Sequence, residues 1–177
     1  MFCLFLMLSF LGPPLFAQTS VSREYQIKAL FLFNFAQFVQ WPPDAFTGAD
    51  EPFRIGILGD DPFDDFLDQT VQGEKVGGHP LVVRRYASVA DVKNCQILFV
   101  SRSESGQMEA VLAGLKDKNI LTVGDAEGFL KSGGIIRFVT EENKIHFRIN
   151  VEAAKRLNLV ISSKVLRLAE IVGPGED

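Results

Sequence analysis

The sequence is poor in the residue types that most often carry chemistry. It has two cysteines and two histidines among 177 residues, and its formal net charge is −4. His79 and His146 lie far apart, with no HExxH or CxxC motif beside either of them, so the sequence predicts no zinc site. The lack of a basic excess argues against a nucleic-acid partner.

The motifs that bind nucleotides or activate a serine are also missing. GILGDD at residues 56–61 has too few glycines for a GxGxxG fingerprint, and no GxxxxGK[ST] loop occurs. No GxSxG elbow is present, and a serine triad would need one of the two histidines. His146 alternates with Ile145 and Phe147, which predicts that it lies on the polar face of a hairpin. We therefore expect no cofactor, no bound metal and no catalytic histidine.

The first 17 residues differ from the rest of the chain. Residues 2–15 form an apolar run, and Ala17 supplies a small residue at its end. This pattern predicts a secretory signal peptide over residues 1–17, although no Lys or Arg precedes the run. The alternative is an uncleaved anchor, for which the run is short. Both interpretations predict that the rest of the chain is exported.

Export makes the cysteine count informative. Cys3 lies in the predicted signal peptide, so the processed chain keeps only Cys95, and a lone cysteine cannot form an internal disulfide. Cys95 precedes a predicted strand at residues 96–100 and is expected to be a small buried hydrophobic side chain. A disulfide to a second chain is the alternative.

An aromatic, helix-length segment at residues 25–41 follows the predicted signal peptide and is stopped by two prolines. It is apolar almost all round, whereas a surface helix normally has one polar face. We therefore expect burial on two sides, either within its own domain or against a partner or second copy. Asn34 is predicted to be a buried amide among the rings, where it needs hydrogen-bond partners. The rings that would form a partner or dimer interface, or else fill the core, are Phe31, Phe35, Phe38 and Trp41.

Strands and helices alternate through the middle of the chain. Helical patterns are expected at residues 63–72, after Ser101, and in a short stretch that ends at Lys131. Ser101 and Glu104 match a capping box. This order is typical of a parallel α/β sheet. The predicted strands are at residues 53–59, 81–86, 96–100 and 120–123.

The C-terminal part predicts a different arrangement. Residues 135–140 and 144–150 alternate apolar and polar side chains across a turn, which indicates a β-hairpin. Asn150 and Ser162 are placed to cap two further helices, the second at residues 164–171. The side chains of that helix expected to face inward are Val165, Leu168 and Ile171.

The predicted fold is a single α/β domain over residues 18–172. It has a mixed, mostly parallel sheet of about six strands flanked by helices. A C-terminal β-hairpin and two helices complete it, and residues 173–177 are expected to form a loose tail.

Polar side chains follow the predicted parallel strands. In an open α/β sheet, ligands bind beyond the carboxyl ends of such strands. A rim of acids, hydroxyls and one arginine there can hold a small polar or zwitterionic ligand. The alternative is that the acids and the serine only cap helices. The predicted ligand-binding residues of this rim are Asp60, Asp61, Ser101, Arg102 and Asp125.

Two basic residues near the C-terminus form a second candidate site. Lys164 and Arg167 are three residues apart and share one helical face, with Arg156 nearby in the sequence. An anionic ligand or an acidic partner can bind such a face. The alternative is a basic surface that contacts only solvent.

Several blocks of this sequence together resemble the YfiR family. They cover nearly the whole chain after the predicted signal peptide. The family consists of exported bacterial proteins and is also described as a domain of unknown function. The matching blocks are LFNFAQFVQWP (residues 32–42), FRIGILGDDPF (53–63), ILFVSRSE (97–104), ILTVGDAEGF (120–129), GGIIRFV (133–139) and FRINVEAAKRLNLVISSKVLRLA (147–169).

The resemblance implies a periplasmic regulatory protein that is not an enzyme. The best-known member represses an inner-membrane diguanylate cyclase by binding its periplasmic part, which lowers cyclic di-GMP and biofilm formation. An outer-membrane lipoprotein can draw that repressor away. Members are described as dimers, and small aromatic or nucleotide-like ligands are described for them. The best-known member also uses cysteine pairs in redox sensing; this chain lacks the pairs, so we expect no such switch.

Two functions follow as hypotheses. The first is a periplasmic repressor of a membrane diguanylate cyclase. The second is an envelope sensor domain that binds a small ligand, at the strand-end rim or at Lys164 and Arg167, and acts on a different membrane signalling protein. A periplasmic hydrolase would need a nucleophile and a base, and the motifs supply neither.

Overall fold

The computed structural model describes residues 22–48 and 50–177. The predicted signal peptide lies outside these residues. Within the part described, we find no helix with the length and hydropathy that a membrane crossing requires.

Eight strands form one mixed sheet in the order β10-β8-β7-β6-β5-β2-β4-β3. The strands β4, β2, β5, β6 and β7 are parallel to one another. The strand β3 is antiparallel to β4, β8 is antiparallel to β7, and β10 is parallel to β8. The prediction of a single α/β domain with a mixed, mostly parallel sheet is confirmed, and β3 and β10 are short edge strands that were not predicted. The bounds are β2 (Phe53–Leu58), β3 (Lys75–Val76), β4 (His79–Tyr86), β5 (Ile97–Val100), β6 (Leu121–Gly124), β7 (Ile136–Glu141), β8 (Lys144–Ile149) and β10 (Glu170–Ile171). A small second sheet pairs β1 (Val39–Gln40) with β9 (Val160–Ile161).

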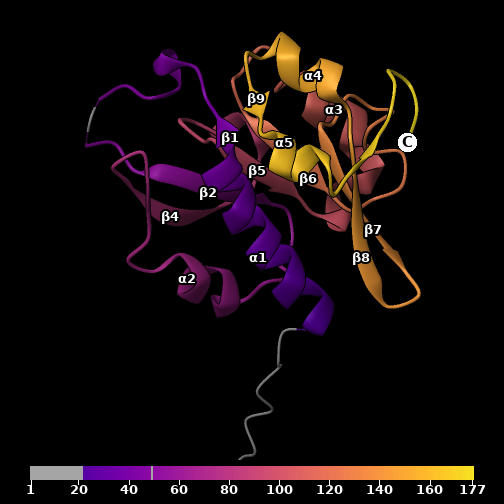
Figure 1. The fold of residues 1–177 in the computed structure, drawn as a ribbon, viewed down its shortest axis with the longest axis horizontal. Coiled ribbons are helices and arrows are strands. Elements are labelled where there is room, and N and C mark those ends of the chain that lie inside the picture. Colours follow the sequence, from indigo (N-terminus) through magenta and orange to yellow (C-terminus); the bar gives the residue numbers. More distant parts are fainter. Residues whose placement is uncertain (1–21, 49) are drawn as a thin grey trace, which may run out of the picture.

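Helices cover both faces of the large sheet. On one face, α1, α2, α4 and α5 enclose the larger core, and in Figure 1 α1 crosses in front of the strands. On the other face, α3 and the turns at residues 126–131 enclose a second core. The helices are α1 (Arg23–Phe38), α2 (Asp65–Val71), α3 (Met108–Ala113), α4 (Val151–Arg156) and α5 (Ser163–Leu166), with short 3-10 helices η1 (Pro43–Ala45), η2 (Val89–Asp91) and η3 (Arg102–Gln107).

The predicted N-caps of three helices are present. The Ser22 hydroxyl accepts a hydrogen bond from the backbone of Tyr25 at the start of α1. Asn150 and Ser162 cap α4 and α5 in the same way. Each of these bonds satisfies a backbone N–H that the helix itself leaves without a partner.

The capping box predicted at Ser101 does not form. The Ser101 side chain makes no capping hydrogen bond, and the chain enters η3 through a backbone bond from Glu104 to the Ser101 carbonyl. The short helix expected before Lys131 is also absent, because residues 126–133 form consecutive turns around the buried Phe129. A Cβ at Gly134 would lie 2.2 Å from the Phe129 ring, so only glycine fits there.

The helix α1 buries one stripe of side chains against the sheet. Asn34 lies outside this stripe and is exposed, so the prediction of a buried amide is wrong. The helix therefore has an outer side, on which Leu30 is 47% exposed. The buried stripe consists of Lys28, Ala29, Leu32, Phe35 and Ala36.

The end of the domain differs from the prediction. The helix α5 ends at Leu166, and β10 adds to the sheet edge in place of the last predicted turns. Val165 is buried as expected, but Leu168 and Ile171 are 69% and 52% exposed, because helical spacing does not apply beyond α5. Residues 173–177, expected to form a loose tail, fold back so that Asp177 contacts the β7–β8 hairpin.

Candidate functional site

The carboxyl ends of the central strands lie in line at one edge of the sheet. Leu58, Val100 and Gly124 are paired in register at the ends of β2, β5 and β6. The strands β4 and β5 follow one another along the chain but lie on opposite sides of β2, so this edge contains a topological switch point. The residues after these strands belong to the predicted ligand-binding rim.

The crevice between β2 and β5 is filled by side chains of η3. The backbone N–H of Asp60 donates to the Ser103 hydroxyl at 2.9 Å. Gly59 has a φ of +85°, and a Cβ there would lie 2.3 Å from that hydroxyl oxygen. Both facts show how closely the loop after β2 approaches η3, and the approach requires glycine.

Asp61 is occupied by structural contacts. Its carboxylate accepts a hydrogen bond from the Phe63 backbone at 2.7 Å and pairs with Arg85 Nε at 2.8 Å. Arg85 also pairs with Asp68 of α2 at 2.5 Å. Asp61 does not cap α2, because that helix begins at Asp65 and its N-cap is Asp64. The contacts of Asp61 and Arg85 instead attach the loop before α2, and α2 itself, to β4.

Asp125 is the centre of a buried ionic cluster. Its Oδ2 lies 2.5 Å from Lys28 Nζ and accepts a hydrogen bond from the Tyr25 hydroxyl at 2.9 Å. The side chains of Lys28 and Asp125 are both 0% exposed. Lys28 Nζ also lies 2.5 Å from Glu24 Oε1, and Arg102 Nε lies 3.3 Å from Asp125 Oδ1. Two acids therefore face two bases, as buried charges require. We call these five residues the Asp125 cluster.

The electrostatics of the cluster follow from its burial. Burial, together with the neighbouring Asp125 carboxylate, raises the pKa of the Tyr25 phenol. Burial alone would raise the pKa of Glu24 as well, but the hydrogen bond and the charge of Lys28 outweigh it and lower that pKa. Glu24 and Asp125 together hold the Lys28 ammonium between them, 4.4 Å from the centre of the Tyr25 ring.

One side of the cluster reaches solvent. Asp125 Oδ1 is buried and makes no hydrogen bond, and it faces the side chain of Arg102, which is 57% exposed. Arg102 is therefore the member of the cluster that an external anion can approach. The remaining members join the start of α1 to the end of β6.

The structure does not bring the second predicted site to this rim. Lys164 Nζ lies 5.2 Å from the centre of the Phe38 ring, at the far end of α1. Phe38 and Lys28 are ten residues apart on one helix, which corresponds to about 15 Å. Lys164 and Arg167 therefore form no common site with the Asp125 cluster.

The aromatic rings of the predicted interface divide between core and surface. Phe35 is 1% exposed and packs against Phe138 and Phe147, with ring centres 5.9 and 5.4 Å away. Trp41 donates its indole N–H to the Gln96 carbonyl and packs edge-on against Phe53. Phe31, Phe38 and Trp41 are each partly exposed.

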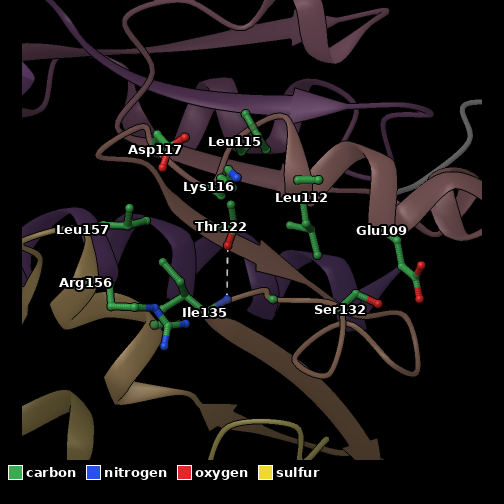
Figure 2. Close-up of a pocket in the computed structure, with 13 residues that line it drawn as sticks. Glu109, Leu112, Leu115, Lys116, Asp117, Thr122, Ser132, Ile135, Arg156 and Leu157 are labelled. Atoms are coloured by element: carbon green, nitrogen blue, oxygen red, sulfur yellow. Dashed lines mark hydrogen bonds between the residues drawn. The ribbon is translucent and has the colours of Figure 1, made fainter.

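A cavity of about 630 Å³ lies between α3, α4 and the turn before β7. Figure 2 shows Arg156 and Glu109 at opposite ends of it. The Thr122 hydroxyl accepts a hydrogen bond from the Ile135 backbone at 3.1 Å. No sequence motif marked this cavity, because its lining comes from elements that are distant in the chain.

Metal ligands do not gather within the described ranges. Over residues 22–48 and 50–177, no three His, Cys, Asp or Glu side chains are arranged to hold a metal ion. His79 stacks on Phe46 and contacts the Glu51 carbonyl, and His146 is exposed on β8.

Comparison with known protein families identifies the domain. A family model described as YfiR/HmsC-like (DUF4154) matches residues 25–170, which is most of the chain. The chain belongs to the YfiR/HmsC-like family. The resemblance seen in the sequence is thereby confirmed, and the matched range contains every predicted site residue. No curated protein sequence is significantly similar to this YfiR/HmsC-like chain.

Sequence reasoning missed three members of the Asp125 cluster in this YfiR/HmsC-like domain. Glu24 and Lys28 are four residues apart, a spacing that allows an ion pair on a helix. Lys28 is also the one charged residue in the buried stripe of α1. A lysine in an apolar stripe needs a buried acid, but only the fold shows that the acid is Asp125.

Cys95 of this YfiR/HmsC-like domain is a free, buried cysteine, as predicted. Its thiol donates to the Ile97 carbonyl at 2.9 Å. Burial raises the pKa of the thiol to about 12, so the side chain is uncharged at neutral pH.

Proposed function

We propose that this chain is a periplasmic regulatory protein that binds an inner-membrane diguanylate cyclase and represses it, which lowers cyclic di-GMP and biofilm formation. The observation that carries the proposal is family membership over residues 25–170. Repression needs no catalysis by this chain, because binding stabilises an inactive arrangement of the cyclase. A competing partner, such as an outer-membrane lipoprotein, shifts the same equilibrium in the opposite direction.

The outer side of α1 is the surface we assign to the cyclase or to a second copy in a homodimer. Phe31 and Phe38 of α1 are partly exposed, as is Trp41 just beyond its end, and Leu30 adds an apolar side chain that is 47% exposed. Phe35 is excluded from this surface because the sheet covers it. Aromatic side chains at a helix surface are well suited to such contacts, since they supply most of the apolar area in many interfaces.

A pull-down from membranes of the source organism tests the partner. The exported protein should recover a membrane protein with a diguanylate cyclase domain, identified by mass spectrometry. Leu30→Glu should abolish recovery, because it places a charge in the proposed contact. Leu168→Glu is the matched control, since Leu168 is also exposed but lies outside α1. Recovery of a different class of membrane sensor, or equal recovery with both variants, would contradict the proposal.

A second candidate function is an envelope sensor that binds a small ligand. The observation that favours it is the cavity between α3 and α4, whose size lies in the usual range for ligand pockets. Arg156 and Glu109 provide opposite charges at its two ends, which suits a zwitterion. Amino acids should then raise the melting temperature of the protein, and Arg156→Gln should remove the effect. The absence of a shift at millimolar ligand would count against this function.

A further inference from the structure

Two arginines face one another across the β7–β8 hairpin. Arg137 and Arg148 are direct cross-strand partners. Their neighbours Phe138 and Phe147 point into the larger core, so both arginines point to the other face of the sheet. Like charges directly opposite one another destabilise a strand pair. Acidic groups beside the two guanidinium groups offset this repulsion, and each arginine has one: Asp177 pairs with Arg137, and Glu170 pairs with Arg148.

The carboxylate that pairs with Arg137 belongs to Asp177. Its Oδ2 accepts a hydrogen bond from the Gly128 backbone at 2.7 Å and forms an ion pair with Arg137 Nη1. Its Oδ1 accepts a hydrogen bond from the Leu130 backbone at 3.0 Å. Arg148 Nη1 donates to the backbone oxygen of Asp177 at 2.7 Å. In Figure 1 the C-terminal end of the chain lies near β7 and β8.

The rest of the fold holds this cradle in place. The turn that carries the two backbone donors is anchored by Phe129, which is 0% exposed. Glu170 of β10 orients Arg148 through an ion pair of 2.8 Å to Nε. The Nε of Arg137 is buried and makes no hydrogen bond, so the cradle contains a donor that Asp177 does not use. The donors thus belong to the folded domain, whereas the acceptor belongs to the tail.

We propose that these groups form a carboxylate-binding site that the chain's own Asp177 occupies, and that a free small carboxylate competes with Asp177 for it. The two oxygens of one planar carboxylate bind separate donors, which is the geometry that arginine and paired N–H groups favour. Asp177 is five residues beyond Val172, so its tether is short and its effective concentration is high. A free carboxylate can bind only while Asp177 is out of the site. Its apparent association constant is therefore the intrinsic constant multiplied by the fraction of protein in which the site is open.

Acetate titrations of the purified protein test this proposal. The readout is the amide resonances of Gly128 and Leu130 in ¹H–¹⁵N spectra, with sodium chloride of equal ionic strength as the salt control. In Asp177→Asn these resonances should shift and saturate, with an apparent affinity at least about tenfold tighter than in the unchanged protein. Acetate should also raise the melting temperature of Asp177→Asn more than chloride does, because it binds the native state.

Two further variants make the result decisive. Arg137→Gln added to Asp177→Asn should remove the saturable shift, and Asp91→Asn, at an exposed position on η2, should respond to acetate as the unchanged protein does. The proposal is overturned if Asp177→Asn and the unchanged protein respond equally. It is also overturned if the two amides show no saturable response in Asp177→Asn, or if the response survives loss of Arg137.

Discussion

Replacing Lys28 by methionine tests the Asp125 cluster most sharply. The substitution keeps the length of the side chain but removes the ammonium that lies 2.5 Å from both Glu24 and Asp125. The Asp125 carboxylate, whose side chain is 0% exposed, then keeps only Tyr25 and Arg102 as partners. Breaking a buried ion pair in this way typically costs about 3–5 kcal/mol.

That cost is large enough to measure by denaturation. For a domain of this size, 1 kcal/mol moves the melting temperature by about 2–4 °C, so we expect Lys28→Met to lower it by about 6–20 °C. Fluorescence of the single tryptophan reports unfolding, because Trp41 packs against Phe53 in the folded state. Urea titrations give the free energy of unfolding of both proteins. They can be compared directly if the dependence of this free energy on urea concentration has the same slope in both.

A matched control and a double variant complete this prediction. Lys155 pairs with Glu152 at 2.9 Å on the surface of α4, so Lys155→Met should cost about 0–1 kcal/mol. Asp125→Asn combined with Lys28→Met should recover part of the loss, since it removes the unpaired buried charge. Equal costs for Lys28→Met and Lys155→Met would refute the buried cluster.

Three further predictions concern the interior. Burial raises the pKa of Cys95 from 9.0 to about 12, so the folded protein holds much less thiolate at about pH 8 than the unfolded chain does. Labelling of Cys95 by a thiol reagent should therefore be about a thousandfold slower in the folded protein. Equal labelling rates would contradict the burial of Cys95. The contribution of the uncharged Cys95 thiol to stability should be complete below pH 9, the pKa of this thiol in the unfolded chain. It should be lost as the pH rises toward about 12, its pKa in the folded protein. Urea titrations at increasing pH can follow this loss. Phe35→Ala should lower the free energy of unfolding, measured in urea titrations, by about 3–5 kcal/mol, because Phe35 is 1% exposed. Leu30→Ala should change it by no more than about 0.5 kcal/mol, because Leu30 is 47% exposed. A loss for Leu30→Ala as large as that for Phe35→Ala would contradict the orientation of α1.

The regular part of the fold could be predicted because local patterns determine it. The alternation across β7 and β8 has the period of a strand and not of a helix. The apolar run at β2 has no period, but its short length and the turn residues after it favour a strand. The caps at Ser22 and Asn150 were predictable for the same reason, since a capping side chain bonds a backbone N–H within the first helical turn. The edge strand β10 was not, because its two residues pair with β8, which is distant in the sequence.

The candidate sites were harder to predict than the fold. The position of Asp125 at the end of a parallel strand could be inferred from the sequence, but its partner Lys28 lies 97 residues away. An over-apolar helix suggested two buried sides, and the structure shows how tertiary packing changes this: Phe35 faces the sheet, while Leu30 and Asn34 face outward. Periodicity alone cannot say which side of an apolar helix meets the sheet.

The most direct test of the regulatory function is the cellular content of cyclic di-GMP. It should be measured by mass spectrometry in the source organism, in a strain that lacks this gene, and in the same strain with the gene restored with or without codons for residues 2–17. If this chain represses a cyclase from the periplasm, cyclic di-GMP should rise when the gene is lost and fall again only when the restored protein keeps its export signal. Unchanged cyclic di-GMP in the strain that lacks the gene would contradict repression of a cyclase by this chain.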